Sequence, residues 1–343
     1  MNKKLIALAV GAALGTPMAA QAGATVYGHG QVEIANYGSD DKGTAVVDNA
    51  RGRIGVKSTE DLGGGLKALF KVEFKADFAD GVAGGKLTDS NGDTVQSDAS
   101  LTKREMMVGL KGNFGEVQLG RLKTAYKYTG GVKYDPFVAT VLEARDGNAM
   151  SGKVGVGAIK KAAGHHAFVD DSIAYKNKFG DISLWITYDL DDGGPSSDTG
   201  GNALTASVKF SQKNWEVFVA TVDDDNDGAP GNGYSATKIG GQFRTGPHKI
   251  SAQLENADTG AVVNPDIQYI YLDYQFKMGK NIFDVAYGQV DPDGANNDHD
   301  WLRLAVIHKF SKKTRAWIGW SNLDSDLPNS DSSVVSVGLR VDI

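Results

Sequence analysis

The sequence predicts an all-β fold, an antiparallel β-barrel of about sixteen strands that crosses a membrane. Apolar and polar residues alternate with a period of two from one end of the chain to the other. Short connections alternate with long ones. Glycine is abundant, at 44 residues, and proline is scarce, at 8, which suits strands and turns better than helices. Mean hydropathy is −0.29, and no twenty-residue apolar segment follows the first 22 residues, so helical spans are excluded.

The first 22 residues read as a secretory signal peptide. Two lysines precede an apolar run over residues 5–14, and Ala-Gln-Ala follows at 20–22. The run is too short to cross a bilayer core of ~30 Å. We therefore expect residues 1–22 to be removed and residues 23–343 to form a single barrel domain. The formal charge then falls from −6 to −8 with the loss of the two lysines, and no cysteine is present to form a disulfide.

Each strand is predicted from its own alternation. In the last run, Val335, Val337 and Leu339 share one face, and Ser336 and Arg340 share the other. A tilted strand needs about 9–11 residues to cross a membrane, which matches most of the runs. An even number near sixteen, with one polar face throughout, is typical of a barrel wide enough to hold water. The predicted strands are 24–36, 49–59, 65–77, 101–112, 114–124, 171–179, 181–190, 202–212, 214–222, 235–245, 247–256, 267–277, 280–290, 300–310, 313–322 and 332–343.

The connections separate the two ends of this barrel. Short turns such as KGN, KFG and TGPH join every second pair of strands, and longer segments join the others. That arrangement is typical of an outer-membrane barrel. A soluble sandwich would not alternate so strictly. The long connections are 37–48, 78–100, 125–170, 191–201, 223–233, 257–266, 290–300 and 322–332.

Aspartate dominates the long connections. Leaving out 125–170, they hold 23 Asp, no Glu and two Lys. One interpretation is a solvated set of turn-forming residues; another is an acidic surface that gathers divalent cations, including those that bridge lipid phosphates. Asp223, Asp225 and Asp227 resemble the start of a calcium loop, but Tyr234 stands where its Glu belongs and no helices flank it. We expect no dedicated metal site and no cofactor.

A basic face runs along two successive strands of this acidic chain. Arg51, Arg53 and Lys57 fall on odd positions, and the odd positions of the next strand carry Lys67, Lys71 and Lys75. The even positions between them are apolar, so the basic face is predicted to meet water inside the barrel. A turn centred near Leu62 would set Arg53 opposite Lys71, where like charges repel.

Three segments carry a combined pattern: TVYGHGQVE, RIGVKSTEDLGGGLKALFKVE and KREMMVGLKGNFGEVQLGR. Together they resemble the general trimeric porins of Gram-negative proteobacteria, and the similarity is strongest over residues 24–125. The resemblance implies a 16-stranded antiparallel transmembrane β-barrel that assembles as a homotrimer in the outer membrane. It also implies an inward-folded third external loop, at about 125–170, that narrows the pore through which small hydrophilic solutes and ions diffuse.

The resemblance implies a constriction between charged groups of opposite sign. The carboxylates expected on the loop are Asp135, Glu143 and Asp146. Arg121 shares outward parity with Val117 and Leu119 and is expected at the trimer interface. The residues expected on the opposing basic wall are Arg51, Arg53, Lys71, Lys75, Arg104 and His29.

Arg104 and Phe168, on or beside this wall, do not fit the simple alternation or the family pattern. Met106, Val108 and Leu110 share the parity of Arg104, so either this apolar set faces the lumen or a bulge intervenes. Phe168 stands where related porins carry a cation, which weakens the basic wall. The chain also ends in Ile343, where the family usually places an aromatic residue.

The predicted function is passive diffusion of small hydrophilic solutes and ions across the outer membrane of a Gram-negative bacterium. The alternative is a substrate-specific channel in which Tyr126, Tyr128, Tyr134 and Phe137 form a stacking platform. An enzyme is not expected, because GxSxG and HExxH are absent. The expected partners are two further copies of the chain, outer-membrane lipid and lipopolysaccharide, the diffusing solutes and divalent cations, but no nucleic acid.

Overall fold

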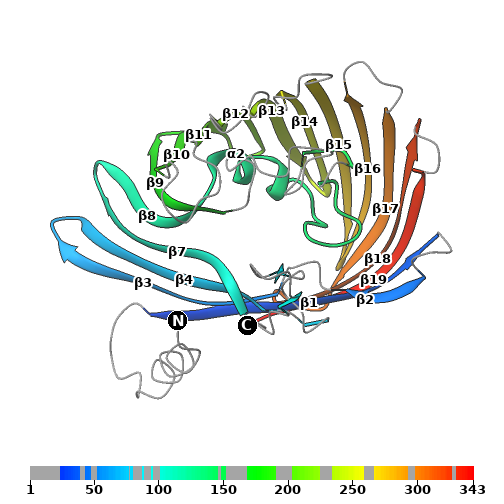
Figure 1. Ribbon diagram of the computed structural model, residues 1–343, viewed down its shortest axis with the longest axis horizontal. Coiled ribbons are helices and arrows are strands. Elements are labelled where there is room, and N and C mark those ends of the chain that lie inside the picture. The colour runs from blue at the N-terminus through cyan, green and yellow to red at the C-terminus, as the bar shows by residue number, and fades with distance from the viewer. Residues whose placement is uncertain are drawn as a thin grey trace.

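The computed structural model describes residues 24–38, 43–47, 52–76, 78–79, 87–88, 94–95, 101–145, 148–151, 168–190, 203–224, 234–258, 266–292, 298–326 and 330–343. Sixteen long antiparallel strands and the short β2 form one sheet, in which each long strand pairs with the next along the chain. The first strand pairs with the last, with Val32 opposite Leu339, and this pairing closes the barrel (Figure 1). The strands are β1 (Thr25–Tyr37), β2 (Thr44–Val47), β3 (Arg53–Gly63), β4 (Leu66–Ala76), β5 (Leu87–Thr88), β6 (Thr94–Val95), β7 (Leu101–Gly112), β8 (Gly115–Lys123), β9 (Phe168–Phe179), β10 (Ile182–Asp189), β11 (Ala203–Ser211), β12 (Trp215–Asp224), β13 (Tyr234–Thr245), β14 (His248–Asp258), β15 (Asp266–Met278), β16 (Asn281–Pro292), β17 (His299–Lys309), β18 (Thr314–Ser325) and β19 (Ser332–Asp342).

The predicted strands are confirmed, with shifts at their ends. The largest shift is in β3, which spans Arg53–Gly63 rather than 49–59, and β9 begins at Phe168 rather than at residue 171. The short β2 pairs with β1, and β5 pairs with β6 in a separate ribbon; none of these three was predicted. The expected signal peptide lies outside the described residues. Among the described residues, neither short helical segment is long and apolar enough to cross a membrane.

The two faces of the sheet are inverted relative to a water-soluble protein. On β14, Ser251 and Glu255 are at most 1 % exposed, whereas Ile250 is 50 % exposed. On β19, Ser336 is fully buried and Val337 is 50 % exposed. Polar groups therefore face the barrel interior and apolar groups face outward, which is the alternation of a strand whose outer face meets lipid.

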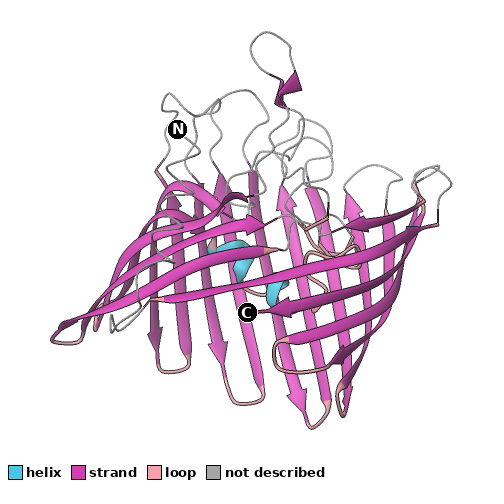
Figure 2. Ribbon diagram, turned by 90° about the horizontal axis from the view of Figure 1, so that it is seen from below, coloured by secondary structure: helices cyan, strands magenta, loops and turns pink. Residues whose placement is uncertain are grey.

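Short hairpin turns join neighbouring strands at one end of the barrel (Figure 2). Gly246 and Gly279 in two of these turns have φ values of 55° and 60°, in the left-handed region that favours glycine. The longer connections follow the opposite ends of the same strands.

Residues 124–145 and 148–151, here called the inner segment, lie within the ring of strands, along the side formed by β11 to β18 (Figure 1). It contains the short helix α2 (Ala125–Tyr128), capped by the Thr124 hydroxyl, and the 3₁₀ turn η1 (Gly131–Lys133). Its apolar side chains form the core of the molecule together with the inner face of the wall, in two clusters built around Trp301 and Trp317. Gly319 permits this close approach, because a Cβ there would lie 2.6 Å from Leu142 Cδ1.

Candidate pore-lining site

Three cations of the basic wall converge on one carboxylate. Glu73 on β4 is 1 % exposed. Arg104 Nε lies 2.8 Å from Glu73 Oε1, Arg53 Nη1 lies 3.5 Å from the same oxygen, and Lys71 Nζ lies 3.8 Å from Oε2. The hydroxyl of Tyr27 donates to Oε2 at 2.8 Å. The carboxylate therefore holds Arg53, Lys71 and Arg104 together without neutralising all three.

A β-bulge turns Arg104 toward this group. Val72 pairs with Met106, but Phe74 pairs with Lys103, so Arg104 and Glu105 together oppose the single residue Glu73. The bulge therefore decides between the two possibilities left open by the sequence. Val108 faces outward, but the bulge breaks the alternation, so Arg104 faces the barrel interior although it shares the parity of Val108.

Glu105 forms the second centre of the wall. It is 3 % exposed, it contacts Lys71, and Lys123 Nζ lies 2.9 Å from its Oε2. Arg53, Lys71, Arg104 and Lys123 thus share two carboxylates, which leaves a formal charge of +2 (four minus two). Sequence reasoning missed the roles of Glu105 and Lys123, because strict alternation gives Lys123 the parity of the outward-facing Leu119 and so leaves Glu105 without this partner.

The predicted register of the β3–β4 hairpin is wrong by four residues, because the partner of Arg53 is Lys75 and not Lys71. Arg53 lies opposite Lys75, and Lys57 lies opposite Lys71. The turn is centred on Gly64, with φ 60°, rather than on Leu62, because three successive glycines tolerate the left-handed backbone that this turn needs. Arg51 lies outside the described residues.

Phe168 acts as a platform for the basic wall. The ring is 9 % exposed, and the guanidinium carbon of Arg104 lies 4.9 Å from its centroid, within cation–π range. Tyr128 packs against the same ring at 6.1 Å. Burial raises the pKa of Tyr128, so its hydroxyl stays protonated. Phe168, which stands where related porins carry a cation, thus helps to orient the neighbouring cation Arg104.

His29 and Lys75 also lie on this side of the barrel. His29 pairs with Arg53 across β1 and β3, and its Nδ1 lies 3.5 Å from Asp342 Oδ1. Lys75 is half-buried opposite Arg53.

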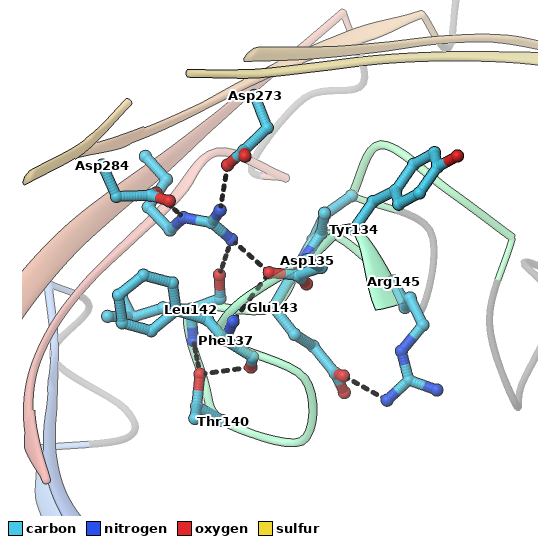
Figure 3. Close-up of polar contacts among 12 residues, drawn as sticks. Tyr134, Asp135, Phe137, Thr140, Leu142, Glu143, Arg145, Asp273 and Asp284 are labelled. Atoms are coloured by element: carbon cyan, nitrogen blue, oxygen red, sulfur yellow. Dashed lines mark hydrogen bonds and ion pairs between the residues drawn. The ribbon is translucent and has the colours of Figure 1, made fainter. Parts of the chain in front are cut away.

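Arg303 on β17 anchors the inner segment to the opposite wall. Its guanidinium is fully buried and uses four of its five N–H donors. Nε donates to Asp284 at 2.8 Å, Nη2 to Asp273 at 3.2 Å, and Nη1 to both Asp135 and the Leu142 carbonyl at 2.9 Å (Figure 3). The rings of Phe137 and Trp301 lie 4.6 and 5.1 Å away.

The carboxylates expected to face the basic wall have other partners. Asp135 accepts from Arg303 and from the backbone N–H groups of Phe137 and Ala144. Glu143 is 6 % exposed, accepts from the Ala139 N–H and contacts Arg145 (Figure 3). Within the described residues, Asp135 has no ion pair with the basic wall. Asp146 lies outside the described residues.

Most of the aromatic side chains near this segment are buried. Tyr126, Tyr134 and Phe137 are each 1 % exposed, and the hydroxyl of Tyr126 donates to Glu255. These three rings pack the segment against the wall and do not form an accessible stacking surface.

Arg121 shares the outward face of Leu119, since Met106 lies opposite Arg121 and Val108 opposite Leu119. Its Nη1 lies 2.5 Å from Asp170 Oδ2 within the same chain. The pair sits at a register shift in β8–β9, beside Asp171 at φ 45°. Asp170 therefore supplies a carboxylate to this guanidinium within the chain, although among the described residues its Nε is buried without a hydrogen-bond partner.

The weak cation candidates are not assembled in the described part of the structure. Asp223 is exposed on β12 opposite Ser235, and Asp225 and Asp227 lie outside the described residues. Among the residues that the structure describes, no group of three or more His, Cys, Asp or Glu could hold a metal ion.

Comparison with known proteins agrees with this architecture. The model of the Gram-negative porin family matches residues 7–326. The major outer membrane protein P.IB of Neisseria meningitidis serogroup B is 26 % identical over 373 residues, covering 99 % of each chain. An anion-selective porin from Comamonas acidovorans superposes with a TM-score of 0.72, at 19 % identity over 93 % of this chain and 99 % of that one. The trimer form of OmpT from Vibrio cholerae superposes with a TM-score of 0.67, at 17 % identity over 93 % and 99 %.

The closed barrel has polar groups inside and apolar groups outside, and the family model covers nearly its whole length. The chain therefore belongs to the Gram-negative porin family, and it is an outer-membrane porin that forms a channel.

Proposed function

We propose that this porin lets small hydrophilic solutes and ions diffuse passively, and that it favours anions over cations. The supporting observation is the imbalance of charge on the basic wall, where Arg53, Lys71, Arg104 and Lys123 share two carboxylates. A fixed positive field beside a water-filled passage attracts anions and raises their local concentration.

The constriction in this proposal lies between the basic wall and the described residues of the inner segment, 124–145 and 148–151. On that segment Asp135 is bound to Arg303, and Glu143 is bound to Arg145. The charge of Glu143 is therefore offset by Arg145, whereas Arg303 shares one positive charge among the fully buried Asp135, Asp273 and Asp284. Because the cations of the basic wall are the more exposed groups, they set the sign of the field in this proposal. The relative from Comamonas acidovorans, which is described as anion-selective, supports the same preference.

The sign of selectivity can be measured directly. Purified protein in a planar bilayer, under a gradient of potassium chloride, should give a reversal potential of the sign for chloride preference. Arg53→Ala and Arg104→Gln should each move that potential toward cation preference. Lys111→Gln is the matched control, because Lys111 lies on the same strand as Arg104 but is 57 % exposed and 3.4 Å from Glu116. An absence of conductance would refute the channel, and a cation preference of the wild-type protein would refute the anion preference.

A substrate-specific channel is a weaker alternative. It needs an accessible binding surface at the constriction, and Tyr126, Tyr134 and Phe137 are buried. Saturable block of the current by one class of solute, and by no other class of similar size, would favour this alternative.

We also propose that the mature chain, from Gly23, assembles as a homotrimer. The trimer form of the Vibrio cholerae relative supports this assembly. Arg121 and Asp170 form an exposed ion pair on the outer face, and an interface with a second chain would shield it from lipid. Light scattering of the detergent-solubilised protein should give the mass of three chains, and single insertions should conduct in steps of three.

The Asp-rich connections are proposed to contact outer-membrane lipid, including lipopolysaccharide, through bound divalent cations. Removal of divalent cations with a chelator should then lower the thermal stability of the protein in membranes that contain lipopolysaccharide. No change in thermal stability would show that these Asp residues are solvated turn formers and not cation contacts.

A further inference from the structure

The short-turn end of β15 to β19 holds a second basic group, distinct from the basic wall. A hollow of about 490 Å³ lies there between the turns and the last residues of the strands. Its lining includes seven cations, and Asp342 is the only carboxylate among the lining residues. The cations are Lys277, Lys280, Lys309, Lys312, Lys313, Arg315 and Arg340. The formal charge of the lining is thus +6 (seven minus one).

Three of these cations lie directly opposite one another on adjacent strands. Lys309 pairs with Arg315 across β17 and β18, and Arg315 pairs with Arg340 across β18 and β19. Neighbouring strands are about 4.8 Å apart, so the row spans about 10 Å. Like charges opposed in this way repel and destabilise the sheet. This ladder of three cations therefore lowers the stability of the empty barrel.

Protein carboxylates do not offset most of this charge. Arg340 Nη2 lies 2.7 Å from Asp342 Oδ1, and Lys280 donates to the Phe310 carbonyl at 3.5 Å. Within the described residues, neither Lys309 nor Arg315 has a carboxylate within the 4.0 Å of an ion pair. The basic wall differs, because each of Arg53, Lys71 and Arg104 has Glu73 within 3.8 Å.

The ladder faces the interior of the barrel. Arg315 shares its face with Trp317, which is 4 % exposed, and Arg340 shares its face with the buried Ser336. The intervening residues Ile318 and Leu339 are 55 % and 44 % exposed on the outer face. The short turns of an outer-membrane barrel lie on the periplasmic side. The hollow is thus open to solutes in the periplasmic mouth of the pore.

We propose that this hollow binds a small soluble solute that carries two or more phosphate groups. Several phosphate oxygens can accept from Lys309, Arg315 and Arg340 at once, and the planar guanidinium groups suit bidentate contacts with phosphate. The volume lies within the range of small-molecule sites. The bound anion supplies the negative charge that the protein itself does not provide, so binding removes the repulsion along the ladder.

Calorimetric titration of the detergent-solubilised protein with sodium pyrophosphate tests this site. We expect saturable binding of one pyrophosphate per chain that weakens as salt is added. Inorganic phosphate should bind more weakly, because it contacts fewer cations. Arg315→Gln and Lys309→Gln should each weaken pyrophosphate binding about tenfold. The titration does not depend on conductance, so its result stands apart from that of the selectivity measurement.

Lys209→Gln is the matched control. Lys209 also faces the interior at the short-turn end, on β11, but its Nζ lies 3.2 Å from Glu216. It should leave the affinity for pyrophosphate nearly unchanged. An equal loss in Lys209→Gln would show that only the general positive potential acts, and would overturn the proposal, as would the absence of saturable binding.

Two further measurements separate binding from folding and from lipid. Without pyrophosphate, Arg315→Gln should unfold at the same temperature as the wild type or higher, because it relieves repulsion. A lower unfolding temperature would assign a structural role to Arg315 and contradict the proposal. In nanodiscs, a change from zwitterionic to anionic lipid should leave pyrophosphate affinity unchanged. Competition by anionic lipid would assign the hollow to headgroups instead of a soluble solute.

Discussion

Two sides of the same inner wall use arginine in opposite ways. Arg303 on β17 is fully buried, and Asp135, Asp273 and Asp284 all contact it. Arg53 and Arg104, on β3 and β7, keep 14 % and 15 % of their side chains exposed and share Glu73 with Lys71. All three arginines point inward. The number of carboxylates around each arginine, and the presence of the inner segment over it, separate an anchoring charge from one that is proposed to act on solutes.

Breaking the anchor should have the largest effect. Arg303→Met leaves three carboxylates buried without their guanidinium, and removal of one partner from a buried ion pair costs about 3–5 kcal/mol. The inner segment should detach from β17, giving a larger and noisier single-channel conductance and faster cleavage by trypsin at Lys127 or Lys133.

Arg53→Met is the control for this change. It removes an arginine from the other side of the wall and should leave the trypsin pattern unchanged while altering ion preference. An unchanged conductance in Arg303→Met would show that packing alone, through residues such as Leu142 and Phe137, holds the segment in place.

Removal of the shared carboxylate of the basic wall should have an intermediate effect. Glu73→Gln leaves Arg53, Lys71 and Arg104 with less negative charge between them, so their repulsion rises and the positive field strengthens. The reversal potential should move further toward chloride. The free energy of unfolding should fall by about 1–3 kcal/mol, because hydrogen bonds to charged groups are lost.

Glu116→Gln is the control, since Glu116 pairs with the exposed Lys111. Glu116→Gln should change neither the reversal potential nor the free energy of unfolding by a comparable amount. A shift toward cation preference in Glu73→Gln would mean that the three cations had moved out of the passage, and that their positions depend on this carboxylate.

The platform under Arg104 should give the smallest effect. Phe168→Leu removes the ring 4.9 Å from the guanidinium while keeping an apolar side chain. The loss should be about 0.5–1 kcal/mol. Chloride preference should fall slightly, because Arg104 would sample more orientations. Phe179→Leu, at an exposed position on the same strand, is the control in the reversal-potential measurement. An effect of Phe168→Leu as large as that of Arg104→Gln would show that the ring fixes the position of Arg104 almost completely.

Period-two alternation determined most of this fold. Strands near the C-terminus need only their own pattern, as Val335, Val337 and Leu339 show, because lipid on one face and the interior on the other impose opposite polarities at every second residue. The short turns, the all-β class and the inward direction of Arg53 and Lys71 followed from the same rule.

The tertiary structure alone decided how the charges are paired. Alternation fails at the β7 bulge, where one extra residue turns Arg104 and places Glu105 beside Lys123. The hairpin turn at Gly64, rather than at Leu62, shifts the partner of each β3 residue on β4 by four residues from the predicted one. Asp135 finds its partner 168 residues away on β17, and nothing local to either residue encodes that contact. A periodic sequence specifies which face a side chain occupies, but ion pairs depend on strand register, bulges and long-range packing, which are properties of the closed barrel.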